Sequence, residues 1–192
     1  MALSADKLAM LRTWAAAGDM MAAEALAQNA TGRAGFVSLG APAAPAVAVH
    51  AAIAASTPIT PVTTGLTNPA VPRSVSVVFG AGWDGGNVIV KGTNQYGRAV
   101  DETIVAVAGT TVAGVKIFKT VTSVEHTAVG TTENYTVQTG SKLGLMNDVM
   151  DSFGMGLVDG VPEKVTMDAT YEGVLFTSAP NGAKVFTLLC NL

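Results

Sequence analysis

The sequence contains one cysteine and two histidines, which limits the chemistry that it can carry. Cys190 has no second cysteine for an intrachain disulfide, so only pairing between chains is left. His50, His126 and Cys190 lack the spacing of a zinc site, and no D-x-D-x-D-G loop offers oxygen ligands for calcium. No G-x-S-x-G segment surrounds a nucleophilic serine. We therefore predict no catalytic residue, no metal site and no cofactor, and the chain is not expected to be an enzyme.

Charge is scarce as well, because charged residues make up 13% of the chain, against a usual share of about 25%. The formal net charge of −3 includes no basic stripe, so nucleic acid is not an expected partner. The longest apolar run, residues 43–55, is too short to cross a bilayer, and the N-terminus lacks a secretory signal. We expect no membrane association and a soluble protein made in a cytoplasm. So little charge also predicts that part of the exterior is buried against other chains.

Few residues are aromatic, whereas glycine is abundant at 21 residues, a mixture that suits short strands joined by tight turns. Residues 62–192 contain successive strand-like runs separated by turn signals, which is the pattern of an antiparallel sandwich. "TNQYG" at 93–97 predicts a hairpin, and "LGLMNDVMDSFGMG" at 143–156 could hold a short helix. The predicted strands are 74–79, 87–91, 99–107, 115–124, 134–139, 164–170, 174–176 and 184–189. We predict a mainly β fold, a jelly-roll-like β-sandwich, with a short helical N-terminal extension.

Residues 1–28 are rich in Ala, Leu and Met, which favours two short helices. Their apolar stripes are too narrow to hold a free hairpin together, so they need a larger surface to lie on. Residues 29–61 are rich in Ala, Pro and Gly and are predicted to form an arm or linker, in which "AVAVHAAIA" at 46–54 could be a strand or a helical turn. The predicted anchoring side chains of the N-terminal segment are Leu8, Leu11, Trp14, Met20, Met21 and Leu26.

The stretch "GAGWDGG" contains the spacing G-x-G-x-x-G at Gly80, Gly82 and Gly85. A dinucleotide fingerprint needs these glycines to open a helix, but "NVIVKG" follows and has strand character. We therefore interpret the segment as a loop between two strands. Trp83 on this loop could fill a pocket of a neighbouring subunit, stack on a sugar, or fold back over its own core.

The charged residues of the β-region are predicted to be structural. Asp101 and Glu102 are adjacent, so they point to opposite faces of a strand and cannot form a catalytic carboxylate pair. We interpret Glu102 as an exposed strand charge that opposes edge-to-edge aggregation. Lys116 and Lys119 are interpreted as solvent-facing or interface charges, on one face only if a bulge lies between them.

Four segments follow one another in an order that carries a family resemblance. They are "TNPAVPR" at 67–73, "GTNQYGRAVDET" at 92–103, "GVKIFKTVTS" at 114–123 and "GSKLGL" at 140–145. This order resembles a group of tailed-phage virion proteins of the capsid decoration, or cement, type. The resemblance implies a non-enzymatic β-sandwich on the exterior of the virion. Its expected partners are the major capsid protein and other copies of itself, as a homodimer or homotrimer, with residues 1–61 as the anchoring arm.

Two alternatives stay open at this point. The first is a tail, neck or head-fibre protein of the virion, because β-sandwiches serve in all these places. The second is a carbohydrate-binding module that uses Trp83 or Tyr96 as a platform on which a glycan stacks.

Overall fold

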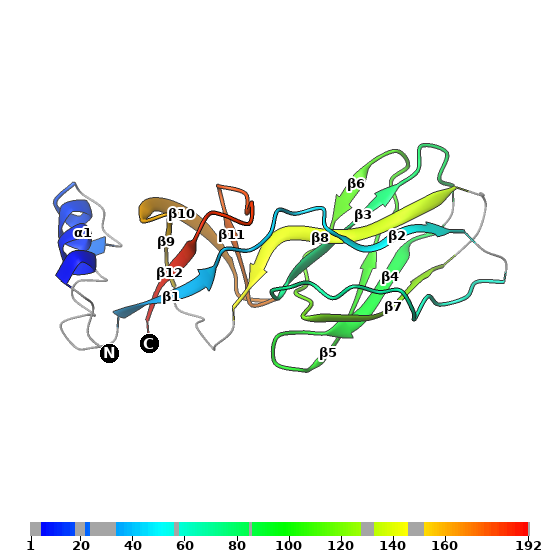
Figure 1. The fold of residues 1–192 in the computed structure, drawn as a ribbon, viewed down its shortest axis with the longest axis horizontal. Helices are drawn as coiled ribbons and strands as arrows, with labels where there is room; N and C mark the ends of the chain where they lie inside the picture. Colours follow the sequence, from blue (N-terminus) through cyan, green and yellow to red (C-terminus); the bar gives the residue numbers. More distant parts are fainter. Residues whose placement is uncertain are drawn as a thin grey trace.

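The computed structural model describes residues 5–17, 22–23, 34–55, 58–84, 86–127, 133–145 and 152–191. In these ranges it contains one helix and a succession of antiparallel strands (Figure 1). The elements are α1 (Ala5–Ala16), β1 (Ala34–Gly40), β2 (Ala48–Ala54), β3 (Arg73–Phe79), β4 (Val88–Thr93), β5 (Ala99–Ile104), β6 (Thr111–Ala113), β7 (Thr120–His126), β8 (Asn134–Gly144), β9 (Ser152–Val158), β10 (Val161–Asp168), β11 (Gly173–Phe176) and β12 (Phe186–Asn191).

The described strands form two sheets and two lobes. One sheet has nine strands in the order β1-β12-β9-β10-β11-β8-β3-β6, with β2 also paired to β8, and the other has the order β5-β4-β7. In Figure 1, β2, β8, β3 and β6 lie over β4, β5 and β7 as a sandwich lobe, whereas β1 and β9–β12 form a C-terminal lobe beside α1. The mainly β, sandwich-like antiparallel fold predicted from the sequence is confirmed, but a jelly-roll order of strands is not.

Alternation of β-branched residues explains the sandwich lobe. Val75, Val77 and Phe79 of β3 point to one face and are buried, because successive side chains of a strand point to opposite faces. They pack against buried residues of the facing strands, such as Val88 and Val90 of β4. The core of this lobe therefore lies between the two sheets, as in a sandwich.

The C-terminal lobe has its own core. Phe186 of β12 is fully buried and packs edge to face against Phe176 of β11, with their ring centroids 4.9 Å apart. Leu188 and Val174 belong to the same cluster. Residues 62–192 therefore contain two hydrophobic cores, whereas the sequence was interpreted as one sandwich domain.

Strand β8 connects the lobes. Its eleven residues pair with β3 along most of their length. On the opposite edge they pair first with β2, from Asn134 to Gln138, and then with β11 at Leu143 and Gly144. Because a strand has only two edges, β2 and β11 lie end to end along β8.

The segment predicted as an arm belongs to the fold instead. β1 pairs with β12 in the C-terminal lobe, and β2 pairs with β8 in the sandwich lobe. The strand considered at 46–54 is therefore confirmed, and the alternative helical turn is wrong. Backbone pairing decided this outcome, because an Ala/Val alternation carries little hydrophobic signal by itself.

Other predicted elements differ in detail. The hairpin at 93–97 is confirmed: Gly97 has φ of 77°, and the Asn94 side chain accepts the backbone N–H groups of Tyr96 and Arg98. The predicted strand 115–124 begins only at Thr120, because residues 114–119 run irregularly between β6 and β7. The short helix considered at 143–156 is wrong over 152–156, which belong to β9, whereas 146–151 lie outside the described residues.

The role of β1 can be tested by truncation. A protein that starts at residue 34 should keep slow hydrogen exchange of the β12 amides, whereas one that starts at residue 41 should lose it, because β12 then has a free edge. Amide exchange followed by NMR measures the difference. Equal protection in the two truncated proteins would contradict a stabilising role of β1.

Candidate functional site at the junction of the lobes

The four segments that carry the resemblance meet at the junction of the lobes. The first of them, residues 67–73, crosses the junction as an irregular segment that bends at residues 70–72 before β3 begins at Arg73, and Pro69 and Pro72 disfavour a helix there. The side-chain oxygen Oδ1 of Asn68 accepts the backbone N–H of Val121 at 2.8 Å, and the backbone carbonyl of Pro72 accepts that of Gly144 at 2.7 Å. The crossing segment is thereby bonded to the third and fourth segments.

Arg73 ends the crossing segment and has the largest fully buried side chain of the described residues. Its Nε donates to the Gly140 carbonyl at 2.7 Å, and its Nη1 donates to the Ala43 carbonyl at 2.9 Å. Nη2 is buried and has no hydrogen-bond partner among the described residues. Burial lowers the pKa of Arg73 from its usual value, because desolvation disfavours the charged form.

Glu102, in the second segment, is 6% exposed and bonds to the third segment. Its Oε1 accepts the backbone N–H of Val115 at 2.6 Å and that of Lys116 at 3.3 Å. Desolvation raises the pKa of Glu102, and these bonds, with the charges of Lys116 and Lys142, only partly oppose the rise. The interpretation of Glu102 as an exposed strand charge is therefore wrong. The irregular segment 114–119 leaves backbone N–H groups without ladder partners, and the carboxylate satisfies two of them.

Lys142, in the fourth segment, joins the two lobes. Its Nζ donates to the Asp168 carboxylate at 2.5 Å and to the Val115 carbonyl at 3.1 Å. Partial burial of Asp168 opposes its ionisation, but Lys142 and backbone N–H groups outweigh burial and hold the pKa of Asp168 below its usual value. Lys142 and Lys116 also lie about 6 Å from the Tyr171 ring, at 6.0 and 5.9 Å.

Two glycines of these segments are required by close packing. A side chain at Gly92 would collide with the backbone of Thr120 on the neighbouring strand β7. A side chain at Gly144 would collide with Ile117 and Pro72 at the junction. A residue with a Cβ atom at either position would push these backbones apart.

Two cavities share residues 68–71 of the crossing segment in their linings. The larger has a volume of about 480 Å³ and is lined by Ser38 and Leu39 of β1, residues 68–72, Lys119, Thr120, Leu143 and Gly144. The smaller has a volume of about 150 Å³, and its lining includes Thr67, Asn68, Arg73 and Thr139. Each cavity has one basic residue in its lining, and neither has a carboxylate there.

Of the predicted anchors of the N-terminal segment, the structure describes Leu8, Leu11 and Trp14, and none of these three has an exposed side chain. Leu11 is fully buried against Met155 and Leu189 of the C-terminal lobe, so its prediction as an anchor to another protein is wrong. Trp14 packs on the same cluster, and Leu8 is half-buried. Met20, Met21 and Leu26 lie outside the described residues. The larger surface that the narrow apolar stripe of this helix was expected to need is therefore the C-terminal lobe of the same chain.

Trp83 is buried, so its prediction as a surface contact is wrong. It is 4% exposed, its ring lies 5.3 Å from that of Tyr135 and 5.6 Å from that of Phe79, and its Nε1 donates to the Gly86 carbonyl. The glycine-rich loop leads directly into β4 and not into a helix, as predicted. Trp83 therefore follows the third interpretation, in which it folds back over its own core.

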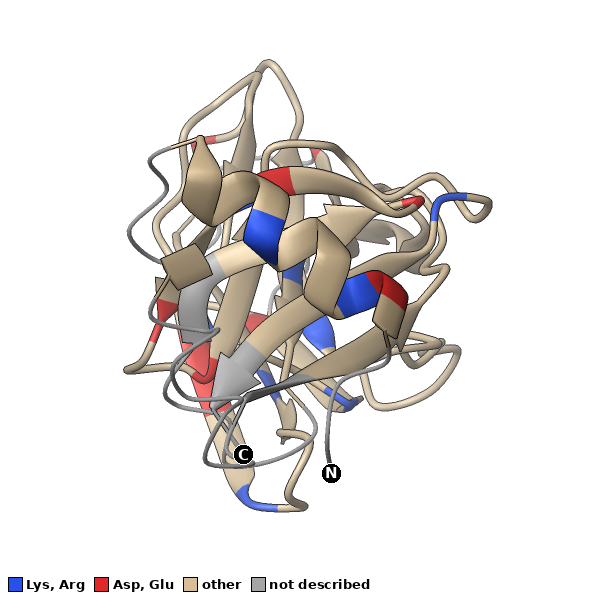
Figure 2. Ribbon diagram, turned by 90° about the vertical axis from the view of Figure 1, so that its left-hand side faces the viewer, with Lys and Arg blue, Asp and Glu red and all other residues tan. Residues whose placement is uncertain are grey.

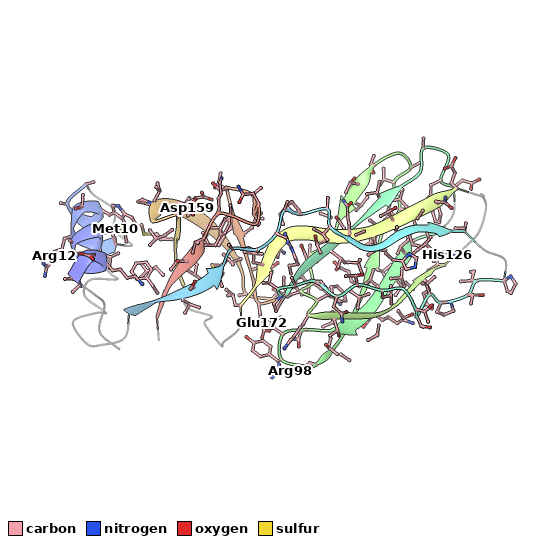
Figure 3. The ribbon with its side chains drawn as sticks, in the orientation of Figure 1. Met10, Arg12, Arg98, His126, Asp159 and Glu172 are labelled. Carbon is pink, nitrogen blue, oxygen red and sulfur yellow. The ribbon has the colours of Figure 1, made fainter. Side chains whose placement is uncertain are left out.

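Tyr96 serves to hold the β4–β5 hairpin at the junction. Its hydroxyl donates to the Leu145 carbonyl at 3.2 Å, and the Arg98 guanidinium lies 5.7 Å from its ring. Beside it, the Gln95 amide donates to the Glu172 carboxylate at 3.2 Å. Figure 3 shows Arg98 and Glu172 together at this side of the junction, where both line a polar pocket.

The residues considered for catalysis and metal binding have other surroundings. His126 is buried inside the sandwich lobe, edge to face with Trp83 and Tyr135 (Figure 3). Burial raises the pKa of Tyr135 to about 12, with a contribution from Glu125. The part of the chain that the structure describes contains no cluster of His, Cys, Asp and Glu side chains suited to a metal. The Cys190 side chain lies outside the description.

Within the described ranges, no helix is long and apolar enough to span a membrane. Comparison of the chain with models of known protein families, with curated proteins and with solved structures found no match.

Sequence reasoning missed Arg73 and Asn68 as structural centres of the junction. A signal was present, because Arg73 is a lone cation directly before the apolar run 74–79 and after two prolines. A charge at the start of a buried strand indicates a side chain that is bonded inside the fold.

The role of Glu102 can be tested with two substitutions. Glu102→Ala should destabilise the protein by about 1–2 kcal/mol, because two part-buried backbone N–H groups lose their acceptor. Glu102→Gln keeps an acceptor and removes the charge. Because the pKa of Glu102 is raised by folding, its favourable contribution is present at low pH and is lost as pH rises through the folded-state pKa. The free energy of unfolding of Glu102→Gln, measured relative to that of the native protein, should therefore be higher at about pH 7 than at about pH 4, because only the native protein loses this contribution as pH rises.

Urea unfolding at both pH values measures these differences, and Glu125→Gln on β7 serves as a matched control. If Glu102→Ala were as stable as the native protein, the carboxylate would not be holding the irregular segment.

Proposed function

We propose that this protein is a structural protein of a tailed-phage virion, of the capsid decoration type, and that it has no enzymatic role. The observation that carries the proposal is the ordered set of four segments over residues 67–145. In the fold, Arg73, Glu102 and Lys142 of these segments form hydrogen bonds at the junction of the lobes. We therefore assign these three side chains a structural role. The surface that binds the major capsid protein then has to lie elsewhere.

Exposed apolar residues on the β-lobes supply such a surface. Val105 and Val107, which follow β5, are 62% and 50% exposed. Their loop lies at the end of the sandwich lobe where β4 begins, because Ile104 pairs with Val88. The opposite end of the molecule, which carries α1, faces the viewer in Figure 2, where most of the ribbon is uncharged, in keeping with the low charge of the sequence. Burial of these valines against a neighbouring subunit would be favourable, since apolar area leaves water.

We place the proposed contact with the capsid on the β-lobes and not on α1, because the apolar residue Leu11 of α1 already packs against the C-terminal lobe of the same chain. The exposed positions of α1 are Ala5, Asp6, Ala9, Arg12, Thr13 and Ala16, which carry small or polar side chains. Leu11 faces the C-terminal lobe. The N-terminal helix therefore closes one end of the molecule, and we no longer assign it the anchoring role.

The alternatives fare differently. A tail, neck or head-fibre position in the virion rests on the same resemblance and is separated from a shell position by copy number. The carbohydrate-binding alternative relied on Trp83 or Tyr96 as an open platform, and Trp83 is buried whereas the Tyr96 hydroxyl is bonded to Leu145. We therefore do not propose glycan binding.

The proposal predicts that the protein occurs in purified phage particles in hundreds of copies. Quantitative mass spectrometry against the major capsid protein measures the copy number. A handful of copies would favour a connector or fibre, and absence from particles would contradict a virion role altogether.

The proposed contact predicts that Val105→Ser with Val107→Ser weakens binding of the purified protein to decoration-free heads by about fivefold to thirtyfold, because about 1–2 kcal/mol of apolar burial is lost. Val161→Ser is the matched control, since Val161 is 64% exposed on the C-terminal lobe. Co-sedimentation with heads measures binding. A larger loss in Val161→Ser than in the double variant would contradict placement of the contact at the end of the sandwich lobe.

A further inference from the structure

The larger sheet has a groove on its outer face in the sandwich lobe. Val75 and Val77 of β3 point into the core between the sheets, so Ser74 and Ser76 point to the opposite face. There they line a groove of about 600 Å³, whose lining also includes residues of β6 and β8 and Leu175 of β11. The groove therefore runs across neighbouring strands of one sheet.

The floor of the groove consists of short side chains. Ser76 pairs with Ala113 of β6 on one side and with Gln138 of β8 on the other, so these three residues form one row across the sheet. Ser74 lies against Gly140, where a Cβ atom would collide with the Ser74 hydroxyl oxygen. A sheet face that meets water ordinarily carries longer polar side chains, whereas this short floor lets another chain approach the backbone closely.

The two serines have hydroxyl groups without a hydrogen-bond partner. Ser74 and Ser76 are 2% and 5% exposed, and neither hydroxyl bonds to another residue in the described part of the chain. Both hydroxyls still reach the space of the groove, because the unpartnered described atoms that are sealed from water belong to Arg73, Gln95 and Tyr135. Polar groups of residues so deeply buried are ordinarily hydrogen-bonded, which indicates that the groove has a partner.

Apolar side chains of the lining are exposed in the single chain. Val115 and Leu175 are 44% and 40% exposed, and both line the groove together with Ala46 and Ala113. An exposed apolar patch with polar residues around it is typical of a contact with another protein.

The lining has one charged residue, and its charge is already paired. Lys142 donates to the Asp168 carboxylate and to the Val115 carbonyl. A charged partner would therefore find no free opposite charge in the groove, so the fitting surface is uncharged. A second copy of this face meets that requirement. Hydroxyl and amide groups both donate and accept, so the serines and Gln138 can bond to the same groups of an identical face across a two-fold axis.

We propose that this groove is the contact through which two copies of the chain form a symmetric dimer. Val115 and Leu175 of each protomer enter the groove of its partner, where the short floor leaves room for them. The contact covers the hydroxyls of Ser74 and Ser76 and gives them hydrogen-bond partners. The inference does not depend on the proposed virion role, and Val105 and Val107 do not line the groove.

The first test uses the native protein. Sedimentation velocity from low micromolar to millimolar concentration should show a monomer–dimer equilibrium. The amide resonances of Ser74 and Ser76 and the methyl resonances of Val115 and Leu175 should shift in NMR spectra with the same concentration dependence. In a mixture of isotope-labelled and unlabelled protein, NOEs should connect Leu175 of one protomer with Ala113 of its partner.

A monomer at every concentration would overturn the proposal and would leave the groove to a different protein. A dimer whose concentration-dependent shifts lie outside the groove would overturn it as well.

The second test places a charge in the contact at exposed positions. Leu175→Arg and Ala113→Arg should each weaken dimerisation by about tenfold or more, because an unpaired guanidinium is buried in the interface. Val185→Arg is the matched control, since Val185 is 45% exposed and does not line the groove, and it should dimerise like the native protein.

Unchanged dimerisation of both groove variants, or equal weakening in Val185→Arg, would overturn the proposal. If a groove variant does not fold, the NOEs between protomers of the native protein decide the matter.

Discussion

The pairing of strand β8 is the constraint on which the rest of the molecule depends. One edge of β8 holds β3, and the other holds β2 and then β11, so the same strand belongs to both lobes. Its alternating side chains Tyr135 and Val137 enter the sandwich core, and Leu143 enters the core of the C-terminal lobe. A shift of its register by one residue would turn these side chains out of both cores, because side chains alternate along a strand.

Polar contacts around β8 restrict the angle between the lobes. Lys142 bonds to Asp168 at the end of β10, Gln95 bonds to Glu172 in the turn between β10 and β11, and Tyr96 bonds to Leu145 after β8. Each of these part-buried contacts contributes only a modest free energy by itself. Together with the continuous backbone ladder, they favour one relative placement of the lobes. A protein proposed to bind a repeating shell benefits from such a fixed shape, because preorganisation lowers the entropic cost of binding.

Arg73 and Glu102 show how the junction uses buried charges. Each is bonded mainly to backbone groups, and each has its pKa shifted toward the neutral form by desolvation. Such groups contribute less to stability than apolar residues of similar size would, but they favour one backbone arrangement over its competitors. Here they hold two irregular segments, 114–119 and the chain around Ala43, which have few ladder bonds of their own.

The sequence by itself determined the class of the fold and many of its strands, because β-branched alternation and turn residues act locally, as in Ser74–Phe79 and the turn at Gly97. It also determined that the glycine-rich loop precedes a strand. Only the tertiary structure decided which strands pair, and this pairing placed 34–40 and 48–54 inside the sheets. It also buried Trp83 and Leu11. Finally, it brought Arg73, Glu102 and Lys142 to one junction. The physical reason is that burial of these residues and pairing of these strands depend on partners far away in the chain. Val115 lies 13 residues from Glu102, and Asn191 lies 157 residues from Ala34, and no local pattern records such partners.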